Sequence, residues 1–225
     1  MTMCRIAPLL TLIASIFVAG CSATPDTRQP ASPGPVAGRG SVNWERPEAR
    51  LCLQQLGQSG AQFAPLPDRM YGAGCSTLDS VKLDRVGGDL GPLTVTNLGP
   101  LACPLANSFA AWARYGVDRA ARQILGSPIA KIETMGSYSC RNVAGTARRS
   151  AHSRAEAIDI GAFVLADGRR ITVKSGWNAD RDEQEFLRTV HRSACKRFGT
   201  VLGPDYNSAH EDHFHLEHGN GSFCR

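Results

Sequence analysis

Hydrophobic side chains recur at the spacing of an amphipathic helix in three parts of the chain. The clearest is 182–198, where Phe186, Leu187, Val190 and Ala194 share one face. The same spacing occurs at 48–56 and 106–125, and each of the three segments is followed by a glycine. Because glycine is common just after the end of a helix, we predict a helix over each segment.

Shorter segments alternate or cluster hydrophobic residues in the manner of β-strands. Asp167-Gly168 lies between two of them, 163–165 and 171–173, and an Asp-Gly pair in that setting is a strong hairpin signal. Further strands are predicted at 80–83, 93–95, 129–140, 157–165 and 214–217. Hairpins imply antiparallel pairing, and helices lie between the strands. The predicted fold class is therefore α+β, with a central antiparallel sheet and flanking helices.

The first residues of the chain are predicted to be a signal peptide, 1–20. Arg5 is followed by an uncharged apolar run, 6–20, which is short for a membrane-spanning helix and typical of a signal peptide. The run ends in Val18-Ala19-Gly20-Cys21, which resembles the lipobox of bacterial lipoproteins, where cleavage leaves a lipid-modified cysteine. A plain signal peptide or a buried apolar helix is the alternative. We expect membrane attachment through lipidated Cys21.

Residues 21–43 have the composition of a disordered tether. Proline and glycine alternate there with serine and threonine, and large apolar side chains are almost absent. Such a segment cannot bury enough surface to offset the entropy lost on ordering. One disulfide-stabilised domain is predicted over 44–225. The protein would then stand in the bacterial cell envelope, anchored in the outer membrane and facing the periplasm.

Composition and charge narrow the possible functions. The 225 residues are 42% hydrophobic and 20% charged, with a formal net charge of +5, which excludes a collagen, a coiled coil and a wholly disordered chain. Basic residues cluster only in short pairs such as Arg148-Arg149 and Arg169-Arg170, too few for a phosphate-tracking surface. We therefore expect no nucleic-acid partner, and we take the domain to be a monomer.

Six cysteines lie in the predicted domain: Cys52, Cys75, Cys103, Cys140, Cys195 and Cys224. An even number of widely spaced cysteines in an exported chain predicts three disulfides. Metal ligation is the alternative, but no Cys-x-x-Cys pair occurs, which disfavours a thiolate zinc site. Sequence alone leaves every pairing open. Our prediction joins neighbours: Cys52 with Cys75, Cys103 with Cys140, and Cys195 with Cys224.

Histidines gather at the end of the chain, at His210, His213, His215 and His218. On a strand, His213 and His215 face the same side, opposite Phe214 and Leu216. Isolated surface histidines and a chance His-x-His pair are the structural alternative.

A fifth histidine, His152, precedes the predicted strand that contains Asp159. Asp159 alternates with Ile158 and Ile160, so its carboxylate should point away from the core. Because the separation from His152 is an odd number of residues, one regular strand cannot present both side chains, and His152 should lie on the loop before the strand. Together with His215, these residues form the three-ligand set of a catalytic zinc with an open fourth position.

The two segments together resemble the signatures of a group of zinc peptidases. Ser150-x-His152-x-x-Ala155-x-Ala157-x-Asp159, followed by Asp212-His213-Phe214-His215, looks like those of the D-Ala-D-Ala carboxypeptidases, lysostaphin-type endopeptidases and the Hedgehog signalling domain. More closely, Cys-Arg-Asn at 140–142 and His-x-Asp-His-Phe-His-Leu-Glu at 210–217 resemble the bacterial extensin-like C-terminal domain family. The first signature usually carries Gly in place of Ala155. The resemblance implies zinc held by His152, Asp159 and His215.

The resemblance leaves two candidates for the catalytic base. In some relatives an acid three residues before the last ligand activates water, which matches Asp212; in others the first histidine of His-x-His does so, which matches His213. Strand alternation favours His213, but a strand end need not alternate. Arg141 lies where relatives hold an arginine that binds the substrate carbonyl or stabilises the oxyanion. A solvated arginine is the alternative.

The resemblance implies a zinc-dependent cell-envelope peptidase that acts on peptidoglycan stem peptides or cross-links. A non-catalytic module that keeps the fold and binds cell-wall polymer is the main alternative, since fold does not fix function. A periplasmic metal carrier that uses the C-terminal histidines is a third possibility.

Overall fold

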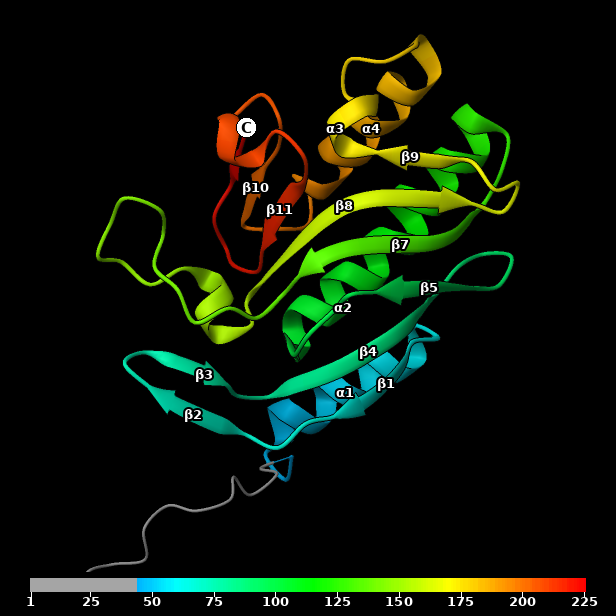
Figure 1. Cartoon of the computed structure of the whole chain (residues 1–225). Helices are drawn as coiled ribbons and strands as arrows, with labels where there is room; N and C mark the ends of the chain where they lie inside the picture. The colour runs from blue at the N-terminus through cyan, green and yellow to red at the C-terminus, as the bar shows by residue number, and fades with distance from the viewer. Residues whose placement is uncertain (1–43) are drawn as a thin grey trace, which may run out of the picture. The chain divides into compact units, whose positions relative to one another are not determined.

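The computed structural model describes residues 44–225 (Figure 1). The predictions for 1–43, the signal peptide, lipidated Cys21 and tether, lie outside the described residues. The N-terminal half comprises α1 (Pro47–Gln58), β1 (Gln62–Pro65), β2 (Arg69–Gly72), β3 (Cys75–Thr77), β4 (Ser80–Gly87), β5 (Pro92–Thr96), β6 (Leu101–Ala102), α2 (Cys103–Trp112) and the π-helical η1 (Ala113–Asp118) and η2 (Ala121–Leu125). The rest comprises β7 (Ile129–Gly136), η3 (Ala151–Arg154), β8 (Ala157–Leu165), β9 (Arg170–Thr172), α3 (Val173–Gly176), α4 (Arg181–Ala194), β10 (Thr200–Leu202), η4 (Ser208–His210), β11 (Phe214–Glu217) and β12 (Phe223–Cys224).

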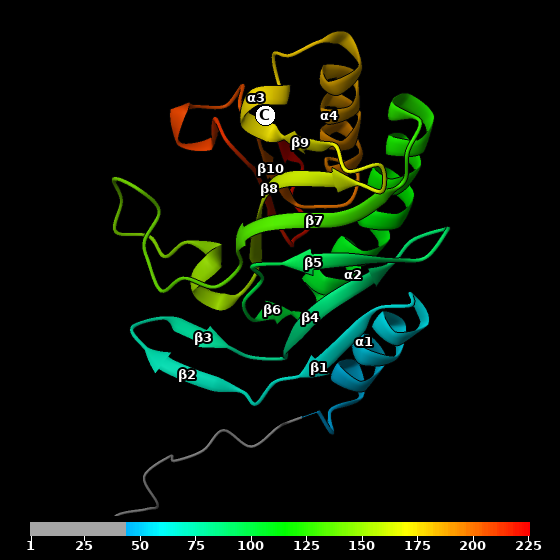
Figure 2. The ribbon, with the colours of Figure 1, turned by 45° about the vertical axis from the view of Figure 1, so that its right-hand side comes forward.

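A ten-stranded sheet forms the centre, with the main order β1-β4-β5-β7-β8-β11-β10-β12. The strands β1, β4, β5, β7 and β8 follow one another across the sheet in front of α2 (Figure 2). Strands β6 and β9 pair with β4 and β8, and β2 and β3 form a separate hairpin. The predicted α+β class with a central sheet and flanking helices is confirmed.

The sheet is antiparallel with two exceptions, β5 with β7 and β10 with β12. The first exception has a clear cause. The long helical segment from α2 to η2 lies between β5 and β7 in the chain, and a connection of that length can return the chain to the same end of the sheet. The Asp167-Gly168 hairpin joins β8 to β9 as predicted, with Gly168 at φ +91°.

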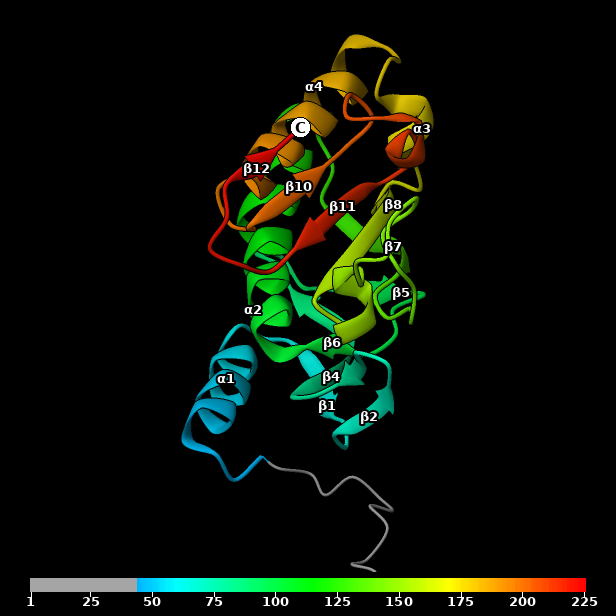
Figure 3. The same cartoon turned by 90° about the vertical axis from the view of Figure 1, so that its left-hand side faces the viewer.

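The helices α1, α2 and α4 lie on one side of the sheet (Figure 3). Their apolar faces and the facing strands make the core, in which Phe109, Trp112, Phe163, Phe186 and Phe214 are fully buried. The Trp112 indole also donates a hydrogen bond to the Val190 carbonyl, 3.1 Å away, which ties α2 to α4. No helix within 44–225 is long and apolar enough to cross a membrane. The opposite face of the sheet is therefore the one that remains for polar side chains.

Three disulfides cross-link the described chain. Cys195–Cys224 is confirmed, but the other two predicted pairs are wrong: the bonds are Cys52–Cys103 and Cys75–Cys140. Cys52 lies on α1 and Cys103 begins α2, so this bond joins two packed helices. Cys75 on β3 is bonded to the loop that follows β7. Proximity in sequence failed as a guide because these partners are brought together by tertiary packing.

Candidate metal centre

Two paired strands place the carboxylate and one imidazole of the centre side by side. In the antiparallel β8–β11 pair, Asp159 lies directly opposite His215. Their neighbours Ile158, Ile160, Phe214 and Leu216 are all completely buried. Because side chains alternate along a strand, burying these apolar residues directs Asp159 and His215 to the face opposite α1, α2 and α4.

The second imidazole comes from η3, the short 3₁₀ helix before β8. Ser150 caps this turn by accepting a hydrogen bond from the His152 backbone N–H. Ala155 then adopts φ +57°, in the left-handed region, and turns the chain from η3 into β8. This conformation favours glycine, which gives a physical reason for the glycine of the resembling signature. His152 thus lies just before the strand, where alternation required it.

The three predicted ligands converge. His152 Nε2 lies 3.2 Å from His215 Nδ1 and 3.2 Å from Asp159 Oδ2, and His215 Nδ1 lies 2.8 Å from Asp159 Oδ1. Both imidazoles are buried, and Asp159 is mostly covered. Three ligand-type atoms around one small space are what a tripod of protein ligands provides to a metal ion.

Each imidazole is held by its other ring nitrogen. His152 Nδ1 donates to the Ser137 carbonyl over 2.8 Å, and His215 Nε2 donates to the Glu217 carboxylate over 2.9 Å. The partner in each case is an oxygen acceptor, which fixes that nitrogen as the N–H. His152 Nε2 and His215 Nδ1 are consequently the nitrogens that face Asp159. Outer partners of this kind accompany nearly all metal-bound histidines.

The charges in the centre reinforce one another. Burial opposes a charge on His215, but hydrogen bonds to Asp159 and Glu217 outweigh it and raise the pKa of His215 to about 9. Burial also opposes the charge of Asp159, yet the hydrogen bonds from His152 and His215 hold its pKa well below its usual range. A hydrogen bond from His215 lowers the pKa of Glu217. The centre therefore keeps its carboxylates ionised and attracts positive charge.

The two candidate bases form a pair instead of competing for one position. Asp212 lies in the turn before β11, and its Oδ1 accepts a hydrogen bond from His213 Nδ1 over 2.8 Å. His213 Nε2 lies 3.5 Å from Asp159 Oδ1, at the edge of the centre. His213 is therefore the group that faces the three ligands, and Asp212 orients its ring.

Arg141 lies on the loop between β7 and η3 and is exposed. The loop is attached to η3 by the hydrogen bond from the Ser150 N–H to the Arg141 carbonyl, 3.1 Å long. Burial is the largest cause that lowers the pKa of His210, to about 4, and the charges of His213 and His215 come next. The Arg141 guanidinium makes a smaller contribution in the same direction. Arg141 is thus within electrostatic range of the centre without contacting the three ligands.

A cleft of about 350 Å³ adjoins the centre on the same face of the sheet. Asp212 and Gly161 both line the cleft. Gly161 lies on β8 between the residues that pair with β11 and the residues that pair with β9. Glu133, Arg170 and Lys174 give the cleft charges of both signs. Asp212 is the residue that links the centre to this cleft, which is large enough for part of a polar ligand.

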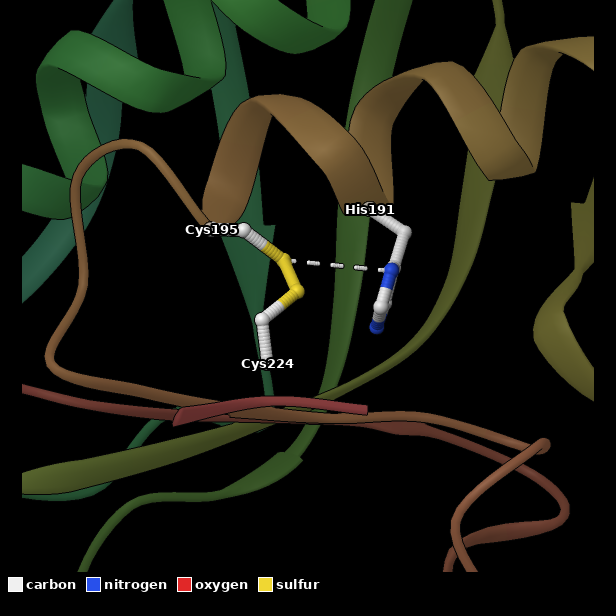
Figure 4. A group of neighbouring side chains, drawn as sticks. All are labelled: His191, Cys195 and Cys224. Carbon is white, nitrogen blue, oxygen red and sulfur yellow. Dashed lines mark hydrogen bonds between the residues drawn. A yellow bond between two sulfur atoms is a disulfide. The ribbon is translucent and has the colours of Figure 1, made fainter. Parts of the chain in front are cut away.

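A second group with metal-ligand side chains lies elsewhere. His191, Cys195 and Cys224 present donor atoms within 4.8 Å of one another. The two sulfurs are bonded to each other, and His191 Nδ1 lies 4.0 Å from Cys195 Sγ (Figure 4). With both cysteines in a disulfide, no thiolate is available to a metal.

Three contributors to the centre were not assigned from the sequence: Ser137, Asn207 and Glu217. Glu217 could have been found, because it lies two residues after His215 on the same strand and shares its face. The contact of Ser137 uses a backbone carbonyl, which no residue type announces. Asn207 caps the 3₁₀ helix η4, and its Oδ1 accepts a hydrogen bond from His210 Nδ1 over 2.7 Å.

Comparison with known proteins gives one match. Neither the curated proteins nor the solved structures contain a match to this chain. The family model described as "Extensin-like protein C-terminus" matches residues 50–225, which include all of the residues of the centre. The resemblance found in the Cys-Arg-Asn and His-x-Asp-His-Phe-His-Leu-Glu segments is thereby extended to nearly the whole folded part, and the chain belongs to the extensin-like C-terminal family.

Proposed function

We propose that this protein is a zinc-dependent peptidase of the bacterial cell envelope, related to the D-Ala-D-Ala carboxypeptidase, lysostaphin and Hedgehog group, which acts on peptidoglycan stem peptides or cross-links. One observation carries the proposal. His152 Nε2, His215 Nδ1 and the Asp159 carboxylate lie 2.8–3.2 Å apart, and both imidazoles are anchored through their other nitrogens. A fourth position is left for water or substrate.

The donor set fits zinc on chemical grounds. Two neutral imidazoles and one carboxylate are common zinc ligands, and hard cations such as Mg²⁺ and Ca²⁺ take mainly oxygen ligands instead. When bound, zinc lowers the pKa of its water toward about 7 and polarises a substrate carbonyl. The contacts with Ser137 and Glu217 hold the outer ring nitrogens, so that His152 Nε2 and His215 Nδ1 face Asp159 and would bind zinc on loss of the protons they share with it.

His213 is proposed as the general base and Asp212 as the residue that positions it. His213 Nε2 faces the centre, whereas its Nδ1–H is held by Asp212. A base oriented by a carboxylate in this way can accept a proton at Nε2 and pass it on to the leaving group. Asp212 as the base is the alternative assignment, and it would have to take up a proton while bound to His213 Nδ1.

The surroundings of the centre suit a peptide substrate. Arg141 is exposed on the adjoining loop and is proposed to bind a substrate carbonyl or the oxyanion. The cleft with Glu133, Arg170 and Lys174 would receive charged groups of a stem peptide. The lipobox-like sequence at Cys21 and the Pro/Gly-rich segment support the further proposal that the domain is tethered to the outer membrane and faces the periplasm, where this polymer lies.

The proposal is tested with the purified full-length protein, loaded with zinc and incubated with isolated muropeptides. We expect shortened stem peptides or resolved cross-links, detected by mass spectrometry, and no product after chelation of zinc or with His152→Gln. Arg141→Ala should retain zinc but lose most of the activity. Stoichiometric zinc and binding to peptidoglycan without any cleaved muropeptide would contradict the peptidase and support a non-catalytic wall-binding module.

A further inference from the structure

His210 is the one histidine of the centre that the proposed reaction does not use. It ends the 3₁₀ helix η4, and its ring centroid lies 5.2 Å from that of His213 and 5.7 Å from that of His215. Donor atoms of these three histidines all lie within 4.8 Å of one another. They therefore form a further group of metal-ligand type inside the centre, and this group shares His215 with the group of His152 and Asp159.

The orientation of His210 is fixed as firmly as that of a metal ligand. Asn207 Oδ1 accepts a hydrogen bond from the Ala209 backbone N–H over 3.1 Å, which identifies this atom as the amide oxygen. The same oxygen lies 2.7 Å from His210 Nδ1, so Nδ1 carries the proton. The lone pair of the neutral His210 imidazole is consequently on Nε2.

All four histidines of the centre share this arrangement. Each has one ring nitrogen bound to an oxygen acceptor: the Ser137 carbonyl, the Glu217 and Asp212 carboxylates, or the Asn207 amide. Four such anchored imidazoles are more than a single zinc with an open position requires, because three protein ligands complete it. Two anchored imidazoles, those of His210 and of the proposed base His213, are not ligands of the first position.

The Asp159 carboxylate contacts histidines of both groups. Asp159 Oδ2 lies 3.2 Å from His152 Nε2, on the side of the first group. Asp159 Oδ1 lies 3.5 Å from His213 Nε2 as well as 2.8 Å from His215 Nδ1. Carboxylates can bridge paired metal ions, which in two-metal sites are about 3.5–4 Å apart.

We propose that the protein binds a second divalent cation of the zinc type at His210 and His213, with Asp159 bridging it to the first. The proposal rests on the first metal position of the proposed function and adds a second one to it. The second cation binds more weakly, because it has two imidazoles and shares one carboxylate. It also occupies His213 Nε2, the proposed base, so that filling the second position opposes turnover.

The stoichiometry of zinc binding tests this inference without any substrate. Full-length protein is freed of metal by chelation, any free thiol is alkylated, and zinc is titrated calorimetrically with bound metal measured after dialysis. We expect two equivalents for the wild type and one for His210→Gln, which keeps the tighter site. Asn207→Ala, which frees the His210 ring, should weaken the second equivalent by about 10–100-fold. The matched control is His218→Gln, an exposed histidine outside both groups, which should bind two.

A spectroscopic measurement makes the test independent of folding defects in the variants. Mn²⁺ bound to both positions of the wild type should give the exchange-coupled resonance of a carboxylate-bridged pair. One equivalent at saturating zinc, or a second equivalent that survives His210→Gln, overturns the inference. One equivalent with muropeptide cleavage leaves the proposed function intact, whereas two equivalents without cleavage leave the second site intact and remove the peptidase.

Discussion

Two regions of this molecule each bring three side chains of metal-ligand type to within 4.8 Å of one another. The first region contains His152, Asp159 and His215, and the second contains His191, Cys195 and Cys224. Only the first has the chemistry of a metal site. In the first region the donor atoms are joined to one another only by hydrogen bonds, and both imidazoles are anchored by oxygen acceptors. In the second region the sulfurs are bonded to each other, and His191 Nε2 is buried without a hydrogen-bond partner among the described residues.

The difference shows that distance alone does not identify a metal centre. The His191 ring lies against the aromatic rings of Trp177 and Phe214, with centroid distances of 5.6 and 5.3 Å, so its surroundings are those of the core. Burial, as the largest cause, lowers the pKa of His191 and keeps it neutral. His215, although just as buried, has its pKa raised by two carboxylates. The carboxylate neighbours, rather than burial, separate a site for cations from a packed imidazole.

The strongest test of the comparison exchanges one histidine in each region. His215→Gln removes a ligand on which Asp159 and His152 converge, and we expect loss of the tighter zinc equivalent and of muropeptide cleavage. His191→Phe keeps the ring volume in its aromatic surroundings and should retain both. Metal content after dialysis, with near-ultraviolet circular dichroism as the check on folding, decides between them. Zinc lost from His191→Phe and kept by His215→Gln would reverse the assignment of the two regions.

Substitution of the proposed base, with the metal ligands unchanged, gives the next largest expected effect. His213→Gln leaves His152, Asp159 and His215 in place, so the tighter zinc equivalent should remain while turnover falls by about 10²–10⁴-fold. Asp212→Asn should retain zinc and show a smaller loss, because the His213 ring is still present but less firmly oriented. Turnover on muropeptides, measured beside zinc content, checks both variants. A larger loss for Asp212→Asn than for His213→Gln would identify Asp212 as the base.

A subtler change tests whether anchoring matters. Glu217→Gln keeps the size of the side chain but removes the charge that holds His215 Nε2, and we expect zinc affinity at the tighter site to fall by about 10–100-fold. Glu211→Gln is the matched control, since it makes the same charge change on an exposed residue paired with Lys174 over 2.9 Å. Competition with a chromogenic chelator measures both affinities. Equal affinities in the two variants would mean that anchoring by Glu217 contributes nothing.

Local pattern predicted much of this fold, and tertiary packing determined the rest. The strand at 214–217 and the hairpin at Asp167-Gly168 follow from alternation and turn chemistry, both of which act within a few residues. The pairing of Cys52 with Cys103 and the parallel alignment of β5 with β7 depend on how α2 packs, which no local pattern contains. Short strands such as β6 and β10 exist only because a neighbour pairs with them.

The candidate centre divides in the same way. Alternation directs Asp159 and His215 to one face, and the odd spacing places His152 before the strand, so the convergence of the three could be predicted. The anchoring by the Ser137 carbonyl could not, because it depends on the course of the backbone between elements, and that by Asn207 depends on the 3₁₀ turn η4, which was not predicted. The hydrogen bond between Asp212 and His213, on which the proposal of His213 as the base rests, could not be predicted either.

The smallest expected effect concerns the pH dependence of stability and belongs to the second region, around His191. The pKa of His191 is lowered in the fold, so below about pH 6.5, the ordinary value for histidine, the unfolded chain takes up a proton that the folded chain does not. The unfolded state then binds more protons, and the free energy of unfolding falls as the pH drops, by at most about 1.4 kcal/mol per pH unit.

His191→Phe should remove this contribution. The quantity to measure is the difference between the wild type and His191→Phe in urea unfolding at pH 7.5 and pH 5.5, since His210, with its pKa lowered to about 4, contributes equally to both proteins. A difference that does not change between the two pH values would mean that the folded and unfolded chains protonate His191 equally, and the contrast between the two regions would lose its electrostatic basis.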